Sequence, residues 1–351
     1  MVIYTVNLSG ITNVIEVFES VIWNVQAYGL GEFQLIVPYN PEIDSILQMG
    51  VILARETDIY SGLIKDPMLI SGRKLTFNAE KGWMLEVHGN GLKSILKRRI
   101  FWSQTNFQNH TEVSAVRQAV TDNAVSPSIS SRAIPNLVVD DYRGDELYTG
   151  QVPAGTNLAE WIEQMSIEYD LMWGIDIRNG KYMFYVYFCT DHTEGSQHPV
   201  IFSEEYENIA SVEYDKDTAE YINVALIGGE GEGTSQVIES IGSASGIDRY
   251  EGYVDGGSVS SNGEIITMQT YRQMLQAYGR EQMTASKSIE KVTGELITNG
   301  QFTLGTDYGL GSKVTVKFKG MTINTKIIEL IYAEDANGYS ILPTFSEWEV
   351  T

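Results

Sequence analysis

The stretch Tyr28-Gly29-Leu30-Gly31-Glu32-Phe33-Gln34-Leu35-Ile36-Val37-Pro38 contains the features that decide the fold. Its second half alternates partly between polar and apolar residues and is rich in β-branched and aromatic side chains, as half-buried strands are. Glycines precede the strand and Pro38 ends it, which is typical of a strand between turns. Residues 84–87 and 59–64 each give a similar strand signal. Several short strands at this spacing predict a small β-barrel or β-sandwich in the first ninety residues.

Helical spacing replaces this alternation near residue 89. Residues 92–96 predict a short helix, and residues 113–120 predict a second one, with Thr111 as its N-cap. Residues 122–153 are rich in Ser, Pro and Asp, which predicts an extended connection along the surface.

The clearest helix of this region has one apolar stripe and an outward-facing row of glutamates. The stripe consists of Leu158, Trp161, Ile162, Met165 and Tyr169, and the glutamates are Glu160, Glu163 and Glu168. Asn179-Gly180 then separates two strand-like runs, which is the strongest short-range signal for a hairpin. We therefore predict a compact α/β insertion over residues 91–198.

Strands return after residue 199. They are predicted at residues 209–214, 221–227, 236–241, 249–254, 314–318 and 322–331. The glycine-rich run 228–233 is interpreted as a hairpin tip, and residues 267–289 as a polar helix. The fold class is therefore α+β and mostly β. Its predicted parts are a β-rich domain at 1–90, the α/β insertion, and a second β-rich domain at 199–351 with peripheral hairpins and one helix.

The composition excludes several classes of function. The 351 residues include 24 Lys and Arg against 46 Asp and Glu, a formal net charge of −22, which disfavours binding to phosphate backbones or to anionic membranes. The single cysteine, Cys189, excludes an intrachain disulfide and any site built from several cysteines. No apolar stretch is long enough to span a bilayer, and no secretory signal is visible. We expect a chain that is made and folded in the reducing cytoplasm and has no membrane anchor.

The histidines give no specific signal for a metal site. His88, His110, His192 and His198 occur in no recognised metal-binding spacing. His192 and His198 flank Glu194 in a predicted loop, where solvated side chains are the favoured interpretation.

The other candidate motifs are also better explained structurally. The glycine run lacks a following Lys-Ser or Lys-Thr, so it is not a phosphate-binding loop. The carboxylate doublets Asp140-Asp141 and Glu204-Glu205 point to opposite faces if they lie in strands, and Cys189 is expected to be a core residue. One dense basic cluster could contact an acidic partner: Lys93, Lys97, Arg98 and Arg99. We therefore predict no catalytic residue, no cofactor-binding residue, no metal-binding residue and no cofactor.

Several segments, in order along the chain, resemble the Siphovirus Gp37-like family of phage tail proteins. They are Trp23 with Tyr28–Leu35, Leu85–Gly89 with Leu92 and Ile95–Arg99, Val200–Ser203 with Asn208, Tyr221–Ala225, Gly246–Glu251, Thr306–Val314, Ile327–Tyr332 and Pro343–Phe345. Each match is weak alone, and their order from Trp23 to Phe345 gives them weight. Ser312 departs from the family, which often has Asp there, and this change is expected to affect only a turn.

The resemblance implies a phage tail hub architecture. Each chain of a homotrimer supplies two tube-like β-barrels, so that three chains form a pseudo-sixfold ring that matches the tail tube. The implied location is the tip or baseplate of a virion tail, or of a phage-tail-like particle. The implied partners are the tail tube or distal tail protein above, the tape measure protein, and a separate spike, tip or fibre protein below. The chain ends directly after the last barrel-like strands, so we expect spike and lytic activities to belong to other chains.

The acidic composition acquires a possible role in such a ring. Our hypothesis is that part of the acidic side chains lines the channel and repels the phosphates of DNA that passes through it without stable binding. Two alternatives stay open at this point, a β-rich cell-wall glycosidase or hydrolase and a carbohydrate-binding module. Clustered carboxylates in a cleft would favour the enzyme, and a shallow aromatic platform would favour the module.

Overall fold

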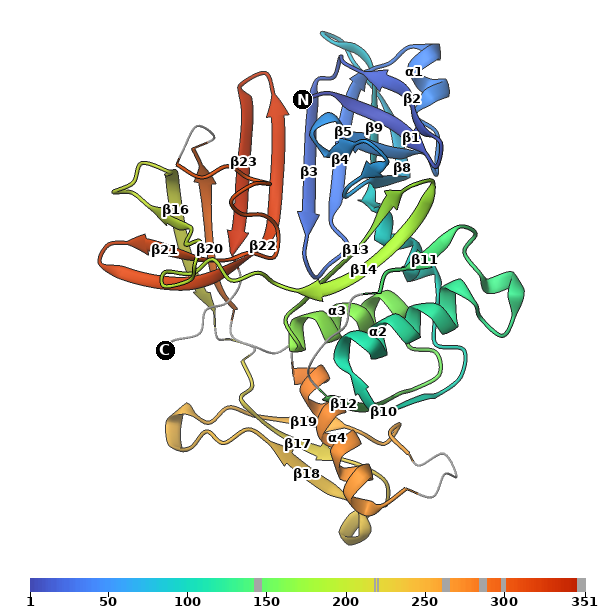
Figure 1. The fold of residues 1–351 in the computed structure, drawn as a ribbon, viewed down its shortest axis with the longest axis vertical. Coiled ribbons are helices and arrows are strands. Elements are labelled where there is room, and N and C mark those ends of the chain that lie inside the picture. Colours follow the sequence, from blue (N-terminus) through green and yellow to red (C-terminus); the bar gives the residue numbers. More distant parts are fainter. Residues whose placement is uncertain are drawn as a thin grey trace.

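The two β-rich ends of the chain join into one sheet. The computed structural model describes residues 1–141, 147–217, 219, 221–260, 266–283, 289–297 and 301–345. β3 (Ser20–Gln26) pairs antiparallel with β22 (Met321–Asp335), from Val21 opposite Glu334 to Gln26 opposite Glu329. Figure 1 shows these two strands side by side at the centre of the molecule. The resulting path of strands is β16-β20-β23-β22-β3-β4-β9-β8-β5-β1-β2.

The N-terminal β unit contains the predicted strands at residues 32–37 and 84–87. Its elements are β1 (Ile3–Asn7), β2 (Gly10–Ile15), β3, β4 (Glu32–Pro38), α1 (Pro41–Ile46), β5 (Ile52–Arg55), β8 (Met68–Asn78) and β9 (Gly82–Gly91). The side chains of Trp23, Phe33, Leu35 and Val87 point to one face of the sheet and are buried, as the alternation predicts. The predicted single strand at 59–64 is wrong. A turn at Ser61-Gly62 divides it into β6 (Ile59–Tyr60) and β7 (Leu63–Ile64).

The C-terminal β unit is built around one long strand. Its elements are β15 (Ile201–Ser203), β16 (Ile209–Asp217), β20 (Ile289–Leu296), β21 (Lys313–Phe318), β22 and β23 (Gly338–Phe345). The first half of β22 pairs with β21, and the second half pairs with β23 and β3. Lys319 and Gly320 have positive φ and form the two-residue turn between β21 and β22. A register shift in β22 at Ile327–Glu329 has a counterpart in β8 at Ile70–Gly72, and such irregularities let a strand bend between layers.

Strands dominate the structure, with 45% of residues in strands and 21% in helices, so the mostly-β expectation is confirmed. Among the described strands, hydrogen bonds do not close a barrel in either β unit.

The α/β unit lies below these sheets in Figure 1. Its elements are the 3₁₀-helix η2 (Leu92–Arg98), β10 (Thr105–Thr111), α2 (Glu112–Val120), the π-helical turn η3 (Thr121–Val125), the 3₁₀-turn η4 (Ser130–Arg132), β11 (Leu137–Val139), β12 (Leu147–Val152), α3 (Leu158–Glu168), β13 (Leu171–Arg178) and β14 (Lys181–Phe188). Thr111 caps α2 by accepting a hydrogen bond from the backbone of Ser114, as predicted. Asn179 and Gly180 form the predicted two-residue turn, both with positive φ.

Three predictions for this unit need correction. The short helix predicted at 92–96 spans Leu92–Arg98 and is a 3₁₀-helix, whose hydrogen bonds join residues three apart. Residues 122–153 are not only a surface connection, since Leu137 and Tyr148 pack in the core of the α/β unit. Of the three glutamates of α3, only Glu160 is exposed, because neighbouring elements cover part of Glu163 and Glu168.

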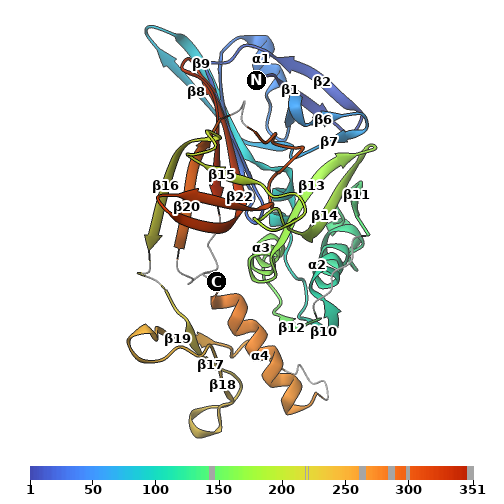
Figure 2. The same ribbon diagram turned by 60° about the vertical axis from the view of Figure 1, so that its left-hand side comes forward.

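The accessory unit, defined as residues 221–260 and 266–283, projects from the other end of the α/β unit (Figure 2). It contains β17 (Val224–Gly228), the 3₁₀-turn η5 (Gly233–Ser235), β18 (Ile238–Ile241), the 3₁₀-turn η6 (Gly246–Asp248), β19 (Glu251–Asp255) and α4 (Met268–Met283). The glycine run forms the predicted hairpin connection between β17 and β18. Ile227, Tyr271, Met274 and Leu275 bury one face of α4 against the three-stranded sheet. The helix predicted at 267–289 is therefore confirmed over Met268–Met283. Residues 284–288 lie outside the described residues, and Ile289 begins β20 and not a helix.

Gly89 of β9 lies where the backbone of β8 comes unusually close. A Cβ at this position would lie 2.0 Å from the carbonyl oxygen of Leu69. We expect Gly89→Ala to lower the free energy of unfolding by about 2 kcal/mol, because β8 must move to relieve the clash. Chemical denaturation measures this. Gly309→Ala is the control, because its Cβ would meet nothing within 4 Å. Equal losses in the two variants would contradict the close approach of β8 and β9.

Candidate functional site

The polar motifs that the sequence singled out do not converge. The ring of His192 lies 3.0 Å from the carbonyl oxygen of His198, while Glu194 forms a 2.7 Å ion pair with Lys317. Asp140 lies near Arg117, and the Glu204-Glu205 doublet is exposed in the turn that follows β15. Among the described residues, no three His, Cys, Asp or Glu side chains are placed to hold a metal ion.

Cys189 is half-buried, so the prediction of a core residue is only partly correct. Burial raises the pKa of its thiol to about 11, with the nearby Asp170 carboxylate as a second cause. A thiol with so high a pKa is a poor nucleophile at neutral pH.

The predicted basic cluster is wrong in one member. Lys97 and Arg98 are exposed, but Lys93 is only 7% exposed and points away from them into the protein. Arg132 lies beside Arg99 instead, and donates a hydrogen bond to the carbonyl oxygen of Ile100. Lys93 is buried because the 3₁₀ turns of η2 place it on the face that packs between the N-terminal β unit and β13.

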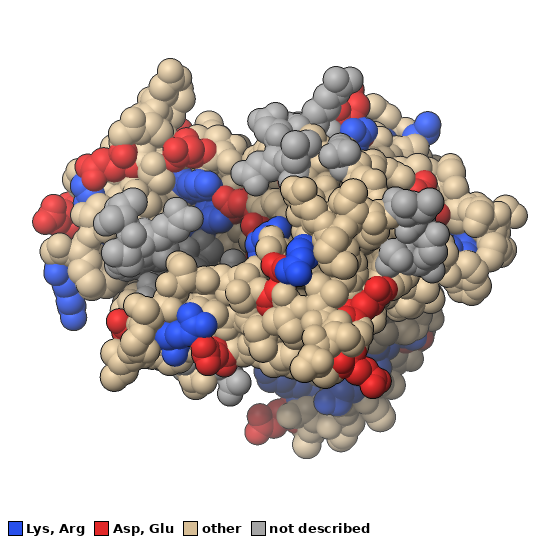
Figure 3. All heavy atoms as spheres, turned by 90° about the horizontal axis from the view of Figure 1, so that it is seen from below, with Lys and Arg blue, Asp and Glu red and all other residues tan. Residues whose placement is uncertain are grey.

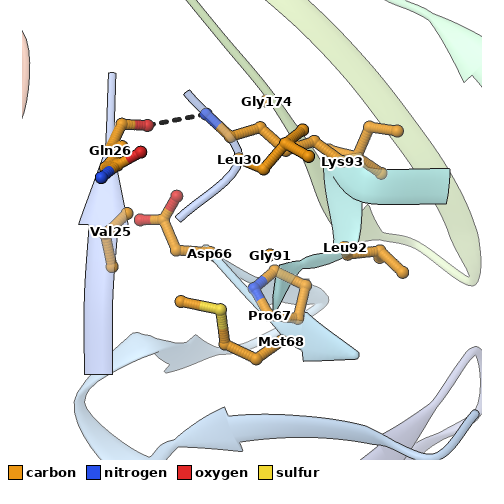
Figure 4. Close-up of a pocket in the computed structure, with 11 residues that line it drawn as sticks. Val25, Gln26, Leu30, Asp66, Pro67, Met68, Gly91, Leu92, Lys93 and Gly174 are labelled. Carbon is orange, nitrogen blue, oxygen red and sulfur yellow. Dashed lines mark hydrogen bonds between the residues drawn. The ribbon is translucent and has the colours of Figure 1, made fainter. Parts of the chain in front are cut away.

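Lys93 is the centre of a buried group of charged residues. Its ammonium donates hydrogen bonds to the carbonyl oxygens of Gln26, at 2.6 Å, and Trp173, at 3.2 Å, and lies 4.7 Å from the centre of the Trp173 ring. Figure 4 shows the lysine reaching Gln26 across a cavity that Asp66 also lines. Burial lowers the pKa of Lys93 to about 8, although the negative charges of Asp66 and Glu163 oppose this shift.

Two further carboxylates belong to the group. The backbone N–H of Asp66 donates to Oδ1 of Asp176 at 3.2 Å, and Asp66 adopts a left-handed φ of 44°. Burial, and next the charge of Asp66, raise the pKa of Asp176 to about 7. Burial also raises the pKa of Asp58 to about 6, although Arg55 binds it through two hydrogen bonds of 2.6 and 3.0 Å. We call Arg55, Asp58, Asp66, Lys93 and Asp176 the buried charge group.

The buried charge group is the strongest feature in favour of an enzyme, because carboxylates with raised pKa values often serve as general acids. The cavity beside it, however, has a volume of only about 20 Å³, enough for about one water molecule. A sugar ring does not fit there, so this arrangement does not provide a glycosidase cleft. The group instead connects elements of different units, since Gln26 belongs to β3, Lys93 to η2 and Trp173 to β13.

A second feature is the open face of the central sheet, opposite the buried face of β3 and β4. Side-chain hydrogen bonds run across it from strand to strand: Asn24 and Gln26 of β3 donate to Glu329 of β22, at 2.6 and 2.7 Å. Gln34 of β4 donates to Glu86 of β9 at 3.0 Å. The face therefore keeps a polar, ordered surface that spans both β units. Its members are Ile22, Asn24, Gln26, Glu32, Gln34, Ile36, Lys74, Thr76, Glu86, His88, Glu329, Ile331, Ala333, Ser340 and Leu342.

The open face ends at two strand edges. Within the described residues, β16 pairs only with β20, and residues 71–78 of β8 pair only with β9. Leu75 and Phe77 on this part of β8 are 48% and 63% exposed, and Phe77 packs against Trp83 with a ring separation of 5.3 Å. An exposed strand edge with apolar side chains is a site for pairing with another chain.

The exposed aromatic side chains do not form a single platform in the described part of the chain. They are distributed over several elements: Tyr60, Phe77, Trp83, Trp102, Tyr206, Tyr214, Tyr250, Tyr253 and Tyr339. Figure 3 shows acidic and basic side chains interspersed on the face seen from below, without a large area of one sign. No described helix is long and apolar enough to cross a membrane.

Comparisons with known proteins agree on one fold. Residues 3–345 match the family model described as Siphovirus ReqiPepy6 Gp37-like protein. A prophage MuSo2 43 kDa tail protein from Shewanella oneidensis is 12% identical, with a TM-score of 0.62 over 99% of this chain and 98% of that chain. The tail protein from Neisseria meningitidis MC58 is 11% identical, with a TM-score of 0.60 over 99% and 95%.

The prophage tail protein gp18 from Listeria monocytogenes EGD-e is 12% identical, with a TM-score of 0.54 over 99% of this chain and 94% of that chain. A comparison with curated proteins finds no match. At these identities the likeness concerns the fold, which is that of phage and prophage tail proteins.

Lys93 can be tested against its exposed neighbour on η2. We expect Lys93→Met to lower the free energy of unfolding by about 3 kcal/mol, because it removes the donor to two backbone carbonyl oxygens and the positive charge that acts most strongly on Asp66. Lys97→Met, on the exposed side of η2, is expected to change it by less than about 0.5 kcal/mol. Urea denaturation at pH 7 measures both variants. If Lys93→Met is as stable as Lys97→Met, the ammonium does not hold the units together.

Proposed function

Because the chain belongs to the Siphovirus ReqiPepy6 Gp37-like family, we propose that it is a structural component of the tail of a phage or phage-tail-like particle. In this proposal it is the trimeric hub that closes the tail tube and adapts its sixfold symmetry to a threefold tip. The observation that carries the proposal is the pairing of β3 with β22, which makes one wall from two separate β units. The fold that the chain shares with prophage tail proteins supports it.

Two β units in each of three chains would give six sheets, the number that a sixfold tail tube requires. The N-terminal β unit contributes β3, β4, β9 and β8, and the C-terminal β unit contributes β22, β23, β20 and β16. Each chain thus supplies two similar curved sheets, which we propose to be the two tube-like barrels of domains 1–90 and 199–351. Three chains related by a threefold axis would present six such sheets around one channel. The α/β domain at 91–198 would lie outside this ring.

In the ring, the edge of β8 at residues 71–78 would meet the edge of β16 of the next copy. The described strand pairing of β16 is with β20 and that of residues 71–78 is with β9, and pairing of the two edges would continue the sheet in the way that β3 and β22 continue it within the chain. Such closure removes the exposed edges that would otherwise promote aggregation.

The open face would then line the channel. Its charged residues include the exposed Glu32 and Lys74 and the half-buried Glu86 and Glu329, an acidic balance that would repel DNA phosphates. Three chains would carry a formal charge of −66, three times the −22 of one chain. DNA would pass through such a channel without stable binding.

The proposed partners are the tail tube or distal tail protein above the ring, the tape measure protein, and a separate spike, tip or fibre protein below it. The proposal assigns no enzymatic activity to this chain, because its buried carboxylates face a cavity that holds about one water molecule. Its proposed location is the tip or baseplate of the tail, after assembly in the cytoplasm of the bacterial host.

The oligomeric state tests the proposal. We expect light scattering to give a particle of about 117 kDa, three times the 39.1 kDa of one chain. The double variant Leu75→Lys/Phe77→Lys is expected to be monomeric, because lysines on an edge strand oppose pairing. The double variant Leu226→Lys/Tyr253→Lys, on the exposed face of the accessory sheet, should remain trimeric.

A wild-type chain that stays monomeric at high concentration and on isolated tails would contradict the hub. If both variants remain trimeric, the chain is still a trimeric hub, but the contact between copies does not involve β8.

The acidic channel is tested by reversing its charge. We expect the trimer of Glu32→Lys/Glu86→Lys to retain short duplex DNA in a gel-shift experiment at low salt, and the wild type not to retain it. Glu204→Lys/Glu205→Lys changes the net charge equally in an exposed turn and serves as the control. Equal retention of DNA by both variants would mean that net charge alone determines DNA binding. That result would contradict an acidic channel at the open face.

A further inference from the structure

One side of α4 makes the apolar contact between the accessory unit and the α/β unit. Tyr271, Met274 and Leu275 belong to the core of the accessory unit, whereas Ala277 packs into the core of the α/β unit. Glu281 follows Ala277 by one helical turn, so the two residues share the face that contacts β12 and α3. One helix therefore belongs to two cores, and its outer face supplies the apolar part of the contact that docks the accessory unit.

Glu281 is the polar centre of this contact. Its side chain is 4% exposed, and Oε1 accepts a hydrogen bond of 2.8 Å from the hydroxyl of Tyr148, which is 1% exposed. The Tyr148 ring packs at 5.9 Å from both Phe107 and Tyr169 and at 6.5 Å from Trp161. A carboxyl group thus enters an aromatic core that has little capacity to solvate a charge.

A second polar contact supports the docked position. The side-chain amide of Gln151, on β12, donates to the carbonyl oxygen of Ser260 and accepts from the backbone N–H of Ser260 at 2.6 Å. Gln151 is 2% exposed and is not ionisable, so this contact does not depend on pH. Glu281 is therefore the pH-sensitive element of the contact.

We propose that the Glu281–Tyr148 pair is a proton-controlled latch that holds the accessory unit on the α/β unit. With a proton on Glu281, the carboxyl group is neutral and fits the aromatic core, and the unit is docked. Loss of the proton places a negative charge in that core and weakens the contact, which releases the accessory unit while the central sheet stays folded.

The charged groups around Glu281 favour this behaviour. Burial raises the pKa of Glu281 to about 7, and the Glu168 carboxylate of α3 adds to the rise. The Tyr148 hydrogen bond and the positive charge of Arg280 oppose it, and Arg280 is shared with Glu168 at 3.8 Å. Tyr169, at the end of α3, keeps its proton because its pKa is raised to about 12. On the opposite side of α4, Glu239 of β18 is paired with Arg272.

The direction of the pH dependence follows from the two states. In the released unit the carboxyl is expected to titrate near its ordinary value of about 4.3, whereas in the docked unit it keeps its proton up to about pH 7. Docking is therefore strongest at a pH below the pKa of Glu281 in the released unit. It weakens as the pH rises from that pKa to the pKa of Glu281 in the docked unit. The docking constant falls about tenfold for each pH unit in the window and changes no further above it.

Hydrogen–deuterium exchange of the full chain tests the latch. Protection factors, corrected for the intrinsic pH dependence of exchange, would be measured at pH 5 and pH 8 for residues 278–283 of α4 and for β12. We expect wild-type protection in these segments to fall about a hundredfold between the two values. Protection of β3 and β4 should stay constant. Glu281→Gln, which mimics the protonated form, should keep its protection at pH 8.

Two further variants separate the latch from general destabilisation. Tyr148→Phe keeps the ring but removes the hydroxyl that stabilises ionised Glu281 in the docked state. Its protection should therefore fall several-fold further than that of the wild type between pH 5 and pH 8. Glu251→Gln removes an exposed carboxylate elsewhere in the accessory unit and should behave like the wild type. Wild-type protection that is equal at pH 5 and pH 8 would overturn the proposal. So would a Glu281→Gln variant that keeps the pH dependence, or a Tyr148→Phe variant whose protection falls no further than that of the wild type.

Discussion

The pairing of β3 with β22 is the constraint on which the rest of the structure depends. It joins residues 21–26 to residues 329–334 and brings the two ends of the chain into one sheet. The α/β unit and the accessory unit are encoded between these strands, so both project from the sheet and leave its polar face open.

Buried polar residues occur at the junctions between units, and the apolar residues form the cores within them. Lys93 links β3 to β13, and Glu281 links α4 to β12. Asp170, in a left-handed conformation before β13, accepts hydrogen bonds from Tyr28 of the N-terminal β unit and from Lys326 of the C-terminal β unit. A polar group that is shielded from water finds its hydrogen-bond partner only when the two units are placed in one relative position. Such groups therefore fix the orientation of neighbouring units more strictly than apolar packing does.

The sequence was informative where local chemistry decides the structure. The cap at Thr111, the Asn179-Gly180 turn and the alternation in β4 depend on neighbouring residues, and all were predicted correctly. The buried charge group was missed because its members are separated along the chain and meet only in the folded state. Asp176 was the one available signal, as a lone carboxylate in the apolar run of β13. Lys93 was misplaced because a basic residue beside Lys97 and Arg98 is normally solvated, and only the packing of η2 against β13 buries it.

The placement of the open face is the central claim, and a three-dimensional reconstruction of the purified protein by electron cryomicroscopy tests it most directly. The account predicts a threefold ring with a continuous sheet around its channel, in which Glu86, His88 and Glu329 face the lumen and the accessory units lie at the periphery. A ring whose lumen is lined by the α/β unit, or by the edge strand β2, would contradict it.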